Sequence, residues 1–197
     1  MTYRTHLAFS TAVTLIPLPL LPFWSSYNPF SYISSIIELT IILAIIFISS
    51  LAPDFDEPNS YLSKRFPWFI ISRVLSLFVK HRGSTHRFIA TFIYAGILSG
   101  LAYYGFGETI INYAYMLYFA AVPYLFHAIG DGFTKGGVPR FWYPFSKKTY
   151  WFLPRALRFY TGGTIENIYF LIFLGIIAIE ILLFLPTFDV ASFLNAS

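Results

Sequence analysis

Four histidines and three aspartates of this 197-residue chain stand where they could bind a metal ion. His127 and Asp131 are four residues apart, so on a helix their side chains share one face and can reach one ion. Asp54 and Asp56 follow Pro53, which stops a helix, so an extended or turn backbone lets both carboxylates reach inward. The chain has no cysteine, which leaves histidine and carboxylate as the metal-binding groups. The predicted metal ligands are His6, Asp54, Asp56, His81, His86, His127 and Asp131.

These residue types suit metal-dependent hydrolysis. A divalent ion lowers the pKa of a bound water toward neutrality, and that water could attack a phosphoester or ester bond. We predict Asp56, Asp131 and Arg82 as catalytic residues. Arg82, Arg87 and Lys135 add positive charge beside the carboxylates and are predicted to hold an anionic substrate. The expected cofactor is a divalent metal, with zinc favoured and manganese or magnesium as alternatives.

The number of candidate ligands leaves the number of ions open. A single catalytic zinc takes three protein ligands and a water, so seven donors are too many for one ion. Either two ions bind, or some of the acids serve as a general base and as groups that orient the ligands.

The elements that position these residues are predicted to be membrane helices. Hydrophobic residues make up 57% of the chain and charged residues 11%, which indicates a membrane protein. About twenty apolar residues cross a bilayer, and five uncharged stretches have that length. They are 7–24, 33–52, 85–104, 110–129 and 165–185, within a single integral membrane domain, 1–197.

The first of these spans is the weakest, because three prolines at positions 17, 19 and 22 should kink or break its outer half. If it turned back within the membrane, His6 would leave the cluster. Glu166, at the start of the last span, is interpreted as an acid that stabilises a helix N-terminus.

The basic residues orient these spans. With the N-terminus in the cytoplasm, twelve of the thirteen lysines and arginines fall in the inner segments 1–6, 53–84 and 130–164. This bias is what the positive-inside rule predicts for five crossings. All four histidines then lie at the cytoplasmic face, where we expect the active site.

Two inner segments are predicted to lie on the membrane surface. Residues 67–80 place polar residues near one helical face and apolar residues around the remainder, the pattern of an interfacial amphipathic helix. The polar residues are Ser72, Arg73, Ser76 and Lys80. Residues 146–160 mix four basic residues with aromatic ones and are interrupted by Pro154. The expected fold is therefore an all-α membrane protein with about five transmembrane helices and one or two interfacial amphipathic helices. Both segments are interpreted mainly as anchors on anionic lipid.

The candidate ligands occur in motifs with a fixed order. These are Thr5-His6, Pro53-Asp54-Phe55-Asp56, His81-Arg82-Gly83-Ser84-Thr85-His86, and His127-Ala128-Ile129-Gly130-Asp131 followed by Thr134 and Gly137-Val138. In order, spacing and topology the chain resembles the YdjM-like, LexA-regulated inner-membrane proteins, described as membrane-bound metal-dependent hydrolases. The resemblance implies that the seven predicted ligands form the metal and catalytic set. Two positions depart from the family pattern, Arg87 where serine is usual and Glu57 where histidine is frequent.

Together these features predict a multi-pass inner-membrane hydrolase that acts at the cytoplasmic face on a lipid-like anionic substrate. Its expected partners are membrane lipids and that substrate, and the net charge of +4 is assigned to topology and headgroups rather than to nucleic acid. A transporter is the first alternative, although transporters usually place ionisable groups near the midplane on broken helices. A scaffold whose helix ends are joined by a structural metal is the second. The sequence leaves the oligomeric state open.

Overall fold

The computed structural model of the chain describes residues 1–16, 36–65, 67–78, 83–106 and 113–184. The α-helices in this part are α1 (Tyr3–Leu15), α2 (Ile36–Leu51), α3 (Trp68–Phe78), α4 (Phe88–Phe106), α5 (Tyr113–Asp131) and α6 (Thr164–Phe184). Two 3₁₀ helices, η3 (Ala52–Asp56) and η5 (Arg155–Leu157), and two short antiparallel strands, β1 (Val138–Pro139) and β2 (Thr149–Tyr150), complete it.

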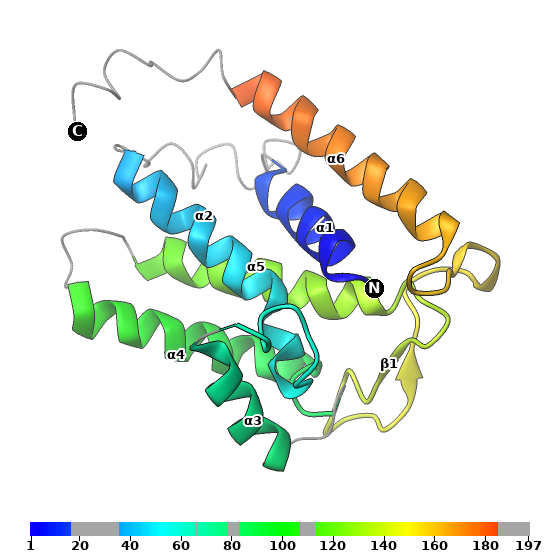
Figure 1. The fold of residues 1–197 in the computed structure, drawn as a ribbon, viewed down its shortest axis with the longest axis horizontal. Helices are drawn as coiled ribbons and strands as arrows, with labels where there is room; N and C mark the ends of the chain where they lie inside the picture. Colours follow the sequence, from blue (N-terminus) through cyan, green and yellow to red (C-terminus); the bar gives the residue numbers. More distant parts are fainter. Residues whose placement is uncertain (17–35, 66, 79–82, 107–112, 185–197) are drawn as a thin grey trace.

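Helix α5 lies at the centre of the bundle and packs against α1, α2 and α4, while α1 also packs against α2 and α6 (Figure 1). Between α2, α4 and α5 the core is built from Ile46, Ala95 and Phe119, all nearly inaccessible to solvent. Between α1 and α6 the rings of Phe9 and Phe173 meet with centroids 4.8 Å apart. These buried side chains form the core between the long helices.

Contacts at one end of the bundle bring together the starts of α1 and α6 and the ends of α2 and α5. The Thr2 amide donates to Glu166 at the start of α6, and His127 near the end of α5 donates to the carbonyl oxygen of Ser50 near the end of α2. We call this end of the bundle the polar end.

The outward faces of the long helices are apolar. Leu101 of α4 and Leu171 and Leu182 of α6 each expose more than six-tenths of their surface, as helices bordered by lipid would. Among the described residues, two helical segments are long and apolar enough to cross a membrane, Leu39–Asp56 and Thr164–Leu182. The apolar part of α4, Phe88–Leu101, is shorter. The mostly helical class is confirmed, and five crossings remain a prediction.

Four of the five predicted spans coincide with α2, α4, α5 and α6, with ends displaced by no more than about three residues, the usual uncertainty of helix ends. The first prediction is different. Helix α1 begins at Tyr3, before the predicted start at residue 7, so His6 is part of the helix. The predicted outer half of that span, with its prolines, lies outside the described residues.

The two predicted surface segments have different structures. Residues 68–78 form helix α3 as predicted, with Ser72 fully buried and Leu77 79% exposed, so its apolar side faces outward. Residues 146–160 form no α-helix. Thr149 pairs with Pro139 in the two-stranded sheet, and Pro154 precedes the single turn η5. Because proline interrupts a helix and the strand pairing supplies other hydrogen bonds, only one of the two segments is an α-helix, and its interfacial position stays a prediction.

Candidate metal centre

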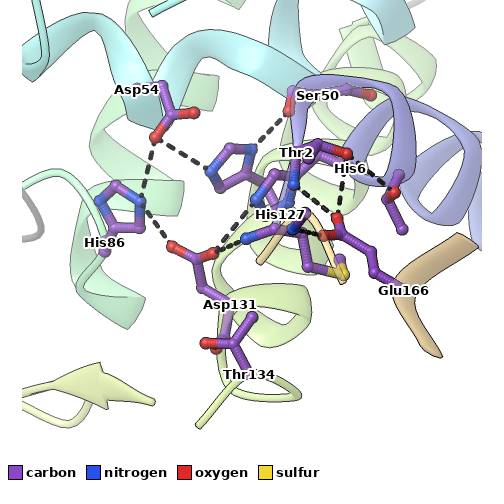
Figure 2. A network of polar contacts seen from close by, with 12 residues as sticks. Thr2, His6, Ser50, Asp54, His86, His127, Asp131, Thr134 and Glu166 are labelled. Atoms are coloured by element: carbon purple, nitrogen blue, oxygen red, sulfur yellow. Dashed lines mark hydrogen bonds and ion pairs between the residues drawn. The ribbon is translucent and has the colours of Figure 1, made fainter. Parts of the chain in front are cut away.

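Four segments deliver polar side chains to one point at the polar end (Figure 2). They are α1, η3, the turn before α4, and the end of α5. The side chains of three histidines and one aspartate from these segments are 0–1% exposed, and Asp54 is 23% exposed. The buried residues are His6, His86, His127 and Asp131.

One oxygen of Asp54 faces two imidazoles. Asp54 Oδ1 lies 3.4 Å from His127 Nε2 and 3.6 Å from His86 Nε2. The other nitrogen of His127, Nδ1, donates a 2.6 Å hydrogen bond to the carbonyl oxygen of Ser50. This bond fixes the tautomer and leaves Nε2 of His127 as the nitrogen available to an ion.

His86 is oriented by side chains. Its Nδ1 lies 3.0 Å from the hydroxyl oxygen of Thr85, and that hydroxyl donates a 2.6 Å hydrogen bond to Asp56 Oδ2. Because the Thr85 proton is used on Asp56, the Thr85 oxygen is left to accept from His86 Nδ1–H. Tyr124 fixes the same turn by donating a 2.7 Å bond to the Thr85 carbonyl oxygen. Nε2 of His86 is thereby aimed at Asp54.

Asp131 has two differently used oxygens. Oδ2 lies 3.4 Å from His86 Nε2, facing the same point as Asp54. Oδ1 accepts hydrogen bonds from His6 Nε2–H at 3.1 Å and from the Met1 ammonium at 2.5 Å. The His6 ring stacks on the His127 ring, with centroids 3.6 Å apart and planes 5° from parallel. One oxygen is therefore held by α1, and the other is directed toward His86.

The donor atoms fit a divalent ion. Corners of a tetrahedral zinc site with bonds of about 2.0–2.1 Å are about 3.4 Å apart, and Asp54 Oδ1 lies 3.4 Å from His127 Nε2 and 3.6 Å from His86 Nε2. Two groups have donor atoms within 4.8 Å of one another, Asp54 with His86 and His127, and His6 with His127 and Asp131. Among the described residues no hydrogen bond reaches the buried Nε2 of His127. An unsatisfied buried polar atom costs about 1–3 kcal/mol, which a bound ion would offset.

The charges at this point are coupled. His86 precedes the first residue of α4, and Asp131 is the last residue of α5. Burial alone would lower the pKa of His86, but the carboxylates of Asp131 and Asp54 outweigh it and raise that pKa to about 9. Burial alone would raise the pKa of Asp131, but the Met1 ammonium and the His6 and His86 rings hold it well below its usual range. Carboxylate charge is thus retained at neutral pH.

The remaining predicted residues are placed differently. Asp56 is 2% exposed and belongs to neither donor group. Its Oδ2 lies 4.0 Å from His86 Nδ1 and is hydrogen-bonded to it through the Thr85 hydroxyl. The Arg87 guanidinium lies over the Tyr143 ring, 4.2 Å from its centroid, and the Lys135 ammonium lies 4.0 Å from the centroid of Tyr160. The structure does not describe residues 81 and 82, so the predictions for His81 and Arg82 lie outside it.

The sequence interpretation of Glu166 missed its main contacts. This buried carboxylate accepts hydrogen bonds from the Thr2 amide at 2.6 Å, from the Thr2 hydroxyl at 3.0 Å and from the Gly162 amide at 2.6 Å. It therefore fastens the start of α1, one turn before His6, to the start of α6. No sequence pattern indicates this contact or the hydrogen bond to the Ser50 carbonyl. The role of Thr85 could have been inferred from its position next to His86.

Gly130 explains how α1 comes so close to α5. A side-chain carbon at this position would overlap Met1 Cε and would lie 3.1 Å from Phe9 Cδ1 and 3.5 Å from His6 Nδ1. Glycine between His127 and Asp131 therefore permits the close approach that stacks His6 on His127.

Comparison with known proteins decides the family. A sequence model of the family described as YdjM inner membrane protein matches residues 1–192. The chain belongs to the YdjM inner membrane protein family. The resemblance noted from the motifs is thereby confirmed, as is the inner-membrane location, which the two apolar helical segments also support.

Two curated YdjM relatives share part of the sequence. The inner membrane proteins YdjM of Escherichia coli (strain K12) and of Shigella flexneri are each 34% identical over 95 residues. The aligned segment covers 48% of this chain and spans 45% of the length of each relative. No solved structure matches the chain.

Proposed function

We propose that this YdjM family member is a membrane-bound metal-dependent hydrolase with its active site at the cytoplasmic face. One observation carries the proposal: two buried imidazoles point their Nε2 atoms at the same Asp54 oxygen, and Asp131 faces that point from a third side. Acidic and imidazole groups gathered at the level of a membrane interface are costly, and such clusters usually serve function.

Asp54, His86 and His127 are the proposed ligands, and a single ion suffices. Imidazole and carboxylate together suit zinc, with manganese as the alternative. When bound, such an ion supplies a Lewis acid and lowers the pKa of a coordinated water. His127 has one free nitrogen because Ser50 occupies the other, so it serves one ion only. The two donor groups that share His127 therefore cannot each hold an ion at the same time, and they are alternative sites for one ion.

Asp131 is proposed as the group that accepts a proton from water. Its Oδ2 faces the ligand nitrogens, while its Oδ1 is held by His6 and by the Met1 ammonium. These contacts keep the carboxylate charged and fixed in direction. Asp56, predicted as catalytic, is proposed instead to orient His86 through Thr85. A catalytic role for Arg82 stays a prediction.

The proposed substrate is a lipid-like phosphoester or ester with an anionic group. Arg87 follows the ligand His86 directly in sequence and stacks on Tyr143, where a guanidinium could pair with a phosphate. Lys135 lies four residues after Asp131 and is exposed. Membrane lipids are the proposed source of the substrate.

A non-enzymatic scaffold is the second candidate, and one feature favours it. Three of the histidines and Asp131 are almost completely buried, as in a structural metal site that joins helix ends. The two proposals differ in the role of Asp131. In an enzyme Asp131 acts on water, so its substitution lowers turnover. In a scaffold there is no turnover for the substitution to lower.

The test uses protein purified in mild detergent. Metal is measured by mass spectrometry, and phosphate or fatty-acid release is followed with phosphatidic acid and an isoprenoid phosphate. We expect bound metal and turnover in the wild type, and loss of both in His86→Ala and Asp54→Asn. Glu57→Gln is the matched control, because Glu57 follows Asp56 directly and its side chain accepts only from the Asn59 amide among the described hydrogen bonds. Metal without any turnover favours the scaffold, and full metal content in both ligand variants contradicts the site.

A further inference from the structure

The segment between the end of α5 and the start of α6 has an unusual composition. Residues 132–163, which we call the basic loop, contain no aspartate or glutamate. They contain six cations, Lys135, Arg140, Lys147, Lys148, Arg155 and Arg158. In Figure 1 this segment, coloured yellow to light orange, lies beyond the ends of α1, α5 and α6 that meet at the polar end. It therefore forms the outer surface of that end.

The basic loop also exposes large apolar and aromatic side chains. Phe145 is 92% exposed and Tyr160 68%, and Trp142, Trp151 and Leu157 are exposed as well. An exposed apolar patch rimmed by charges marks an interaction surface. Tryptophan and tyrosine are favoured where a membrane meets water, and lysine and arginine are favoured beside anionic headgroups.

Hydrogen bonds hold this surface in one conformation. The Arg140 amide donates to the Lys148 carbonyl at 2.8 Å, and the Lys135 amide donates to the Phe159 carbonyl at 2.9 Å. Trp151 Nε1 donates to the Lys135 carbonyl at 3.2 Å, and the Arg158 guanidinium lies over the Trp151 ring, 4.7 Å from its centroid. The cations and aromatic rings therefore form a preformed surface.

The positive charge of the loop is not neutralised by the part of the chain that the structure describes. Across the described ranges, none of the six cations forms an ion pair. Helix α3 offers a comparison, because it also exposes an apolar side but carries Arg73 as its one described cation. The exposed apolar side of α3 could pack against a neutral bilayer surface. The six cations of the basic loop instead favour an anionic partner.

We propose that the basic loop binds the anionic headgroups of lipids in the leaflet that faces the polar end. Its exposed aromatic rings enter the interface, and Arg140, Lys147, Lys148 and Arg155 contact the lipid phosphates. Because the loop follows Asp131 directly, lipid binding holds the polar end against the membrane. The proposal does not depend on hydrolysis or on a bound metal.

The experiment measures which lipid lies next to the loop. The full-length chain carries Trp24→Phe and Trp68→Phe, so that Trp142 and Trp151 are the only fluorescent tryptophans. It is reconstituted into bilayers that contain the same proportions of phosphatidylglycerol and phosphatidylcholine. In one preparation the phosphatidylglycerol is brominated, and in the other an equal mole fraction of the phosphatidylcholine is brominated, so that the quenching compares the two headgroups.

We expect brominated phosphatidylglycerol to quench at least about twofold more, since a cation near an anionic leaflet can contribute up to about fivefold in affinity. The excess should disappear in Lys147→Gln/Lys148→Gln/Arg155→Gln. It should remain in the matched control Lys64→Gln/Arg65→Gln/Arg73→Gln, which removes three exposed cations elsewhere.

Equal quenching by the two brominated lipids overturns the proposal, and so does an excess that survives the triple substitution in the loop. If the triple variant does not fold, a salt titration of the parent protein decides the question. The excess must fall as ionic strength rises, because screening weakens contacts between exposed charges. An excess that does not respond to salt contradicts an electrostatic headgroup site.

Discussion

The two sides of the His127 ring differ in how their donor atoms are held. On one side, Asp54 Oδ1 faces His86 and His127, and the far nitrogens of both rings are fixed, by Thr85 and by the Ser50 carbonyl. On the other side, His6 stacks on His127 and its Nε2 is already used on Asp131, while no hydrogen bond of the described residues reaches its Nδ1.

This difference distinguishes residues suited to bind a metal ion from residues suited to orient Asp131. A metal-binding histidine usually donates its second nitrogen to a fixed acceptor, which His86 and His127 do. His6 instead uses its bonded nitrogen to hold a carboxylate. We therefore propose the Asp54 side as the side that binds the ion, and the His6 side as the one that directs Asp131.

The largest effect is expected for the ring that both sides share. His127→Ala should weaken zinc binding by more than about a hundredfold, because it removes a ligand from a three-ligand site. The dissociation constant is measured by competition with a chelator in detergent solution. Binding within a few-fold of the wild type would mean that His127 is not a ligand.

Asp131→Asn should separate the two sides. We expect zinc affinity to change little while turnover falls by about a hundredfold or more, since asparagine keeps the shape but cannot accept the proton. Metal content and initial rates are measured on the same preparation, with Glu57→Gln as the control acid. Loss of zinc to the extent seen in His127→Ala would mean that Asp131 is a ligand, and it would contradict the separate roles of the two sides of the His127 ring.

Changes in the supporting groups should be smaller and should differ between the sides. Thr85→Val cuts the link from His86 to Asp56 and should weaken zinc affinity by about tenfold. His6→Phe keeps a ring against His127 but loses the bond to Asp131, so it should lower turnover and leave zinc affinity nearly unchanged. If zinc affinity were lost in His6→Phe and kept in Thr85→Val, the His6 side would bind the ion and the Asp54 side would not.

The pH dependence of zinc binding follows from the pKa of His86. Because this pKa is raised to about 9, His86 carries a proton at neutral pH that zinc must displace. Apparent affinity should therefore rise with pH, by up to about tenfold per unit, and level off near pH 9. Titrations in buffers of graded pH measure this slope, and an affinity that is constant between pH 6 and pH 8 would exclude His86 as a ligand.

The fold was predictable to the extent that hydrophobicity determines it. Long apolar stretches predict α2, α4, α5 and α6 closely, because a helix that faces lipid must be apolar over its whole length. Residues 146–160 were expected to lie on the surface, but their strand pairing with Val138 and Pro139 depends on a contact that no local pattern indicates.

The candidate site was predictable by residue type but not by role. The motifs bring His6, Asp54, His86, His127 and Asp131 to one point, and their side chains do converge. The sequence does not indicate which of these residues are the proposed metal ligands and which orient other groups. That assignment depends on hydrogen bonds to a main-chain carbonyl and to a threonine hydroxyl. The tether from Glu166 to Thr2 joins residues 164 positions apart, so it was equally hidden.

Metal stoichiometry in three proteins tests the central claim most directly. Wild type, Asp131→Asn and His86→Ala are purified under the same conditions, dialysed against zinc, and analysed for zinc per chain by mass spectrometry. One ion held by Asp54, His86 and His127 predicts about one zinc in the wild type, about one in Asp131→Asn, and close to none in His86→Ala. Two zinc ions in the wild type, or equal loss in both variants, would contradict a single site with Asp131 outside it.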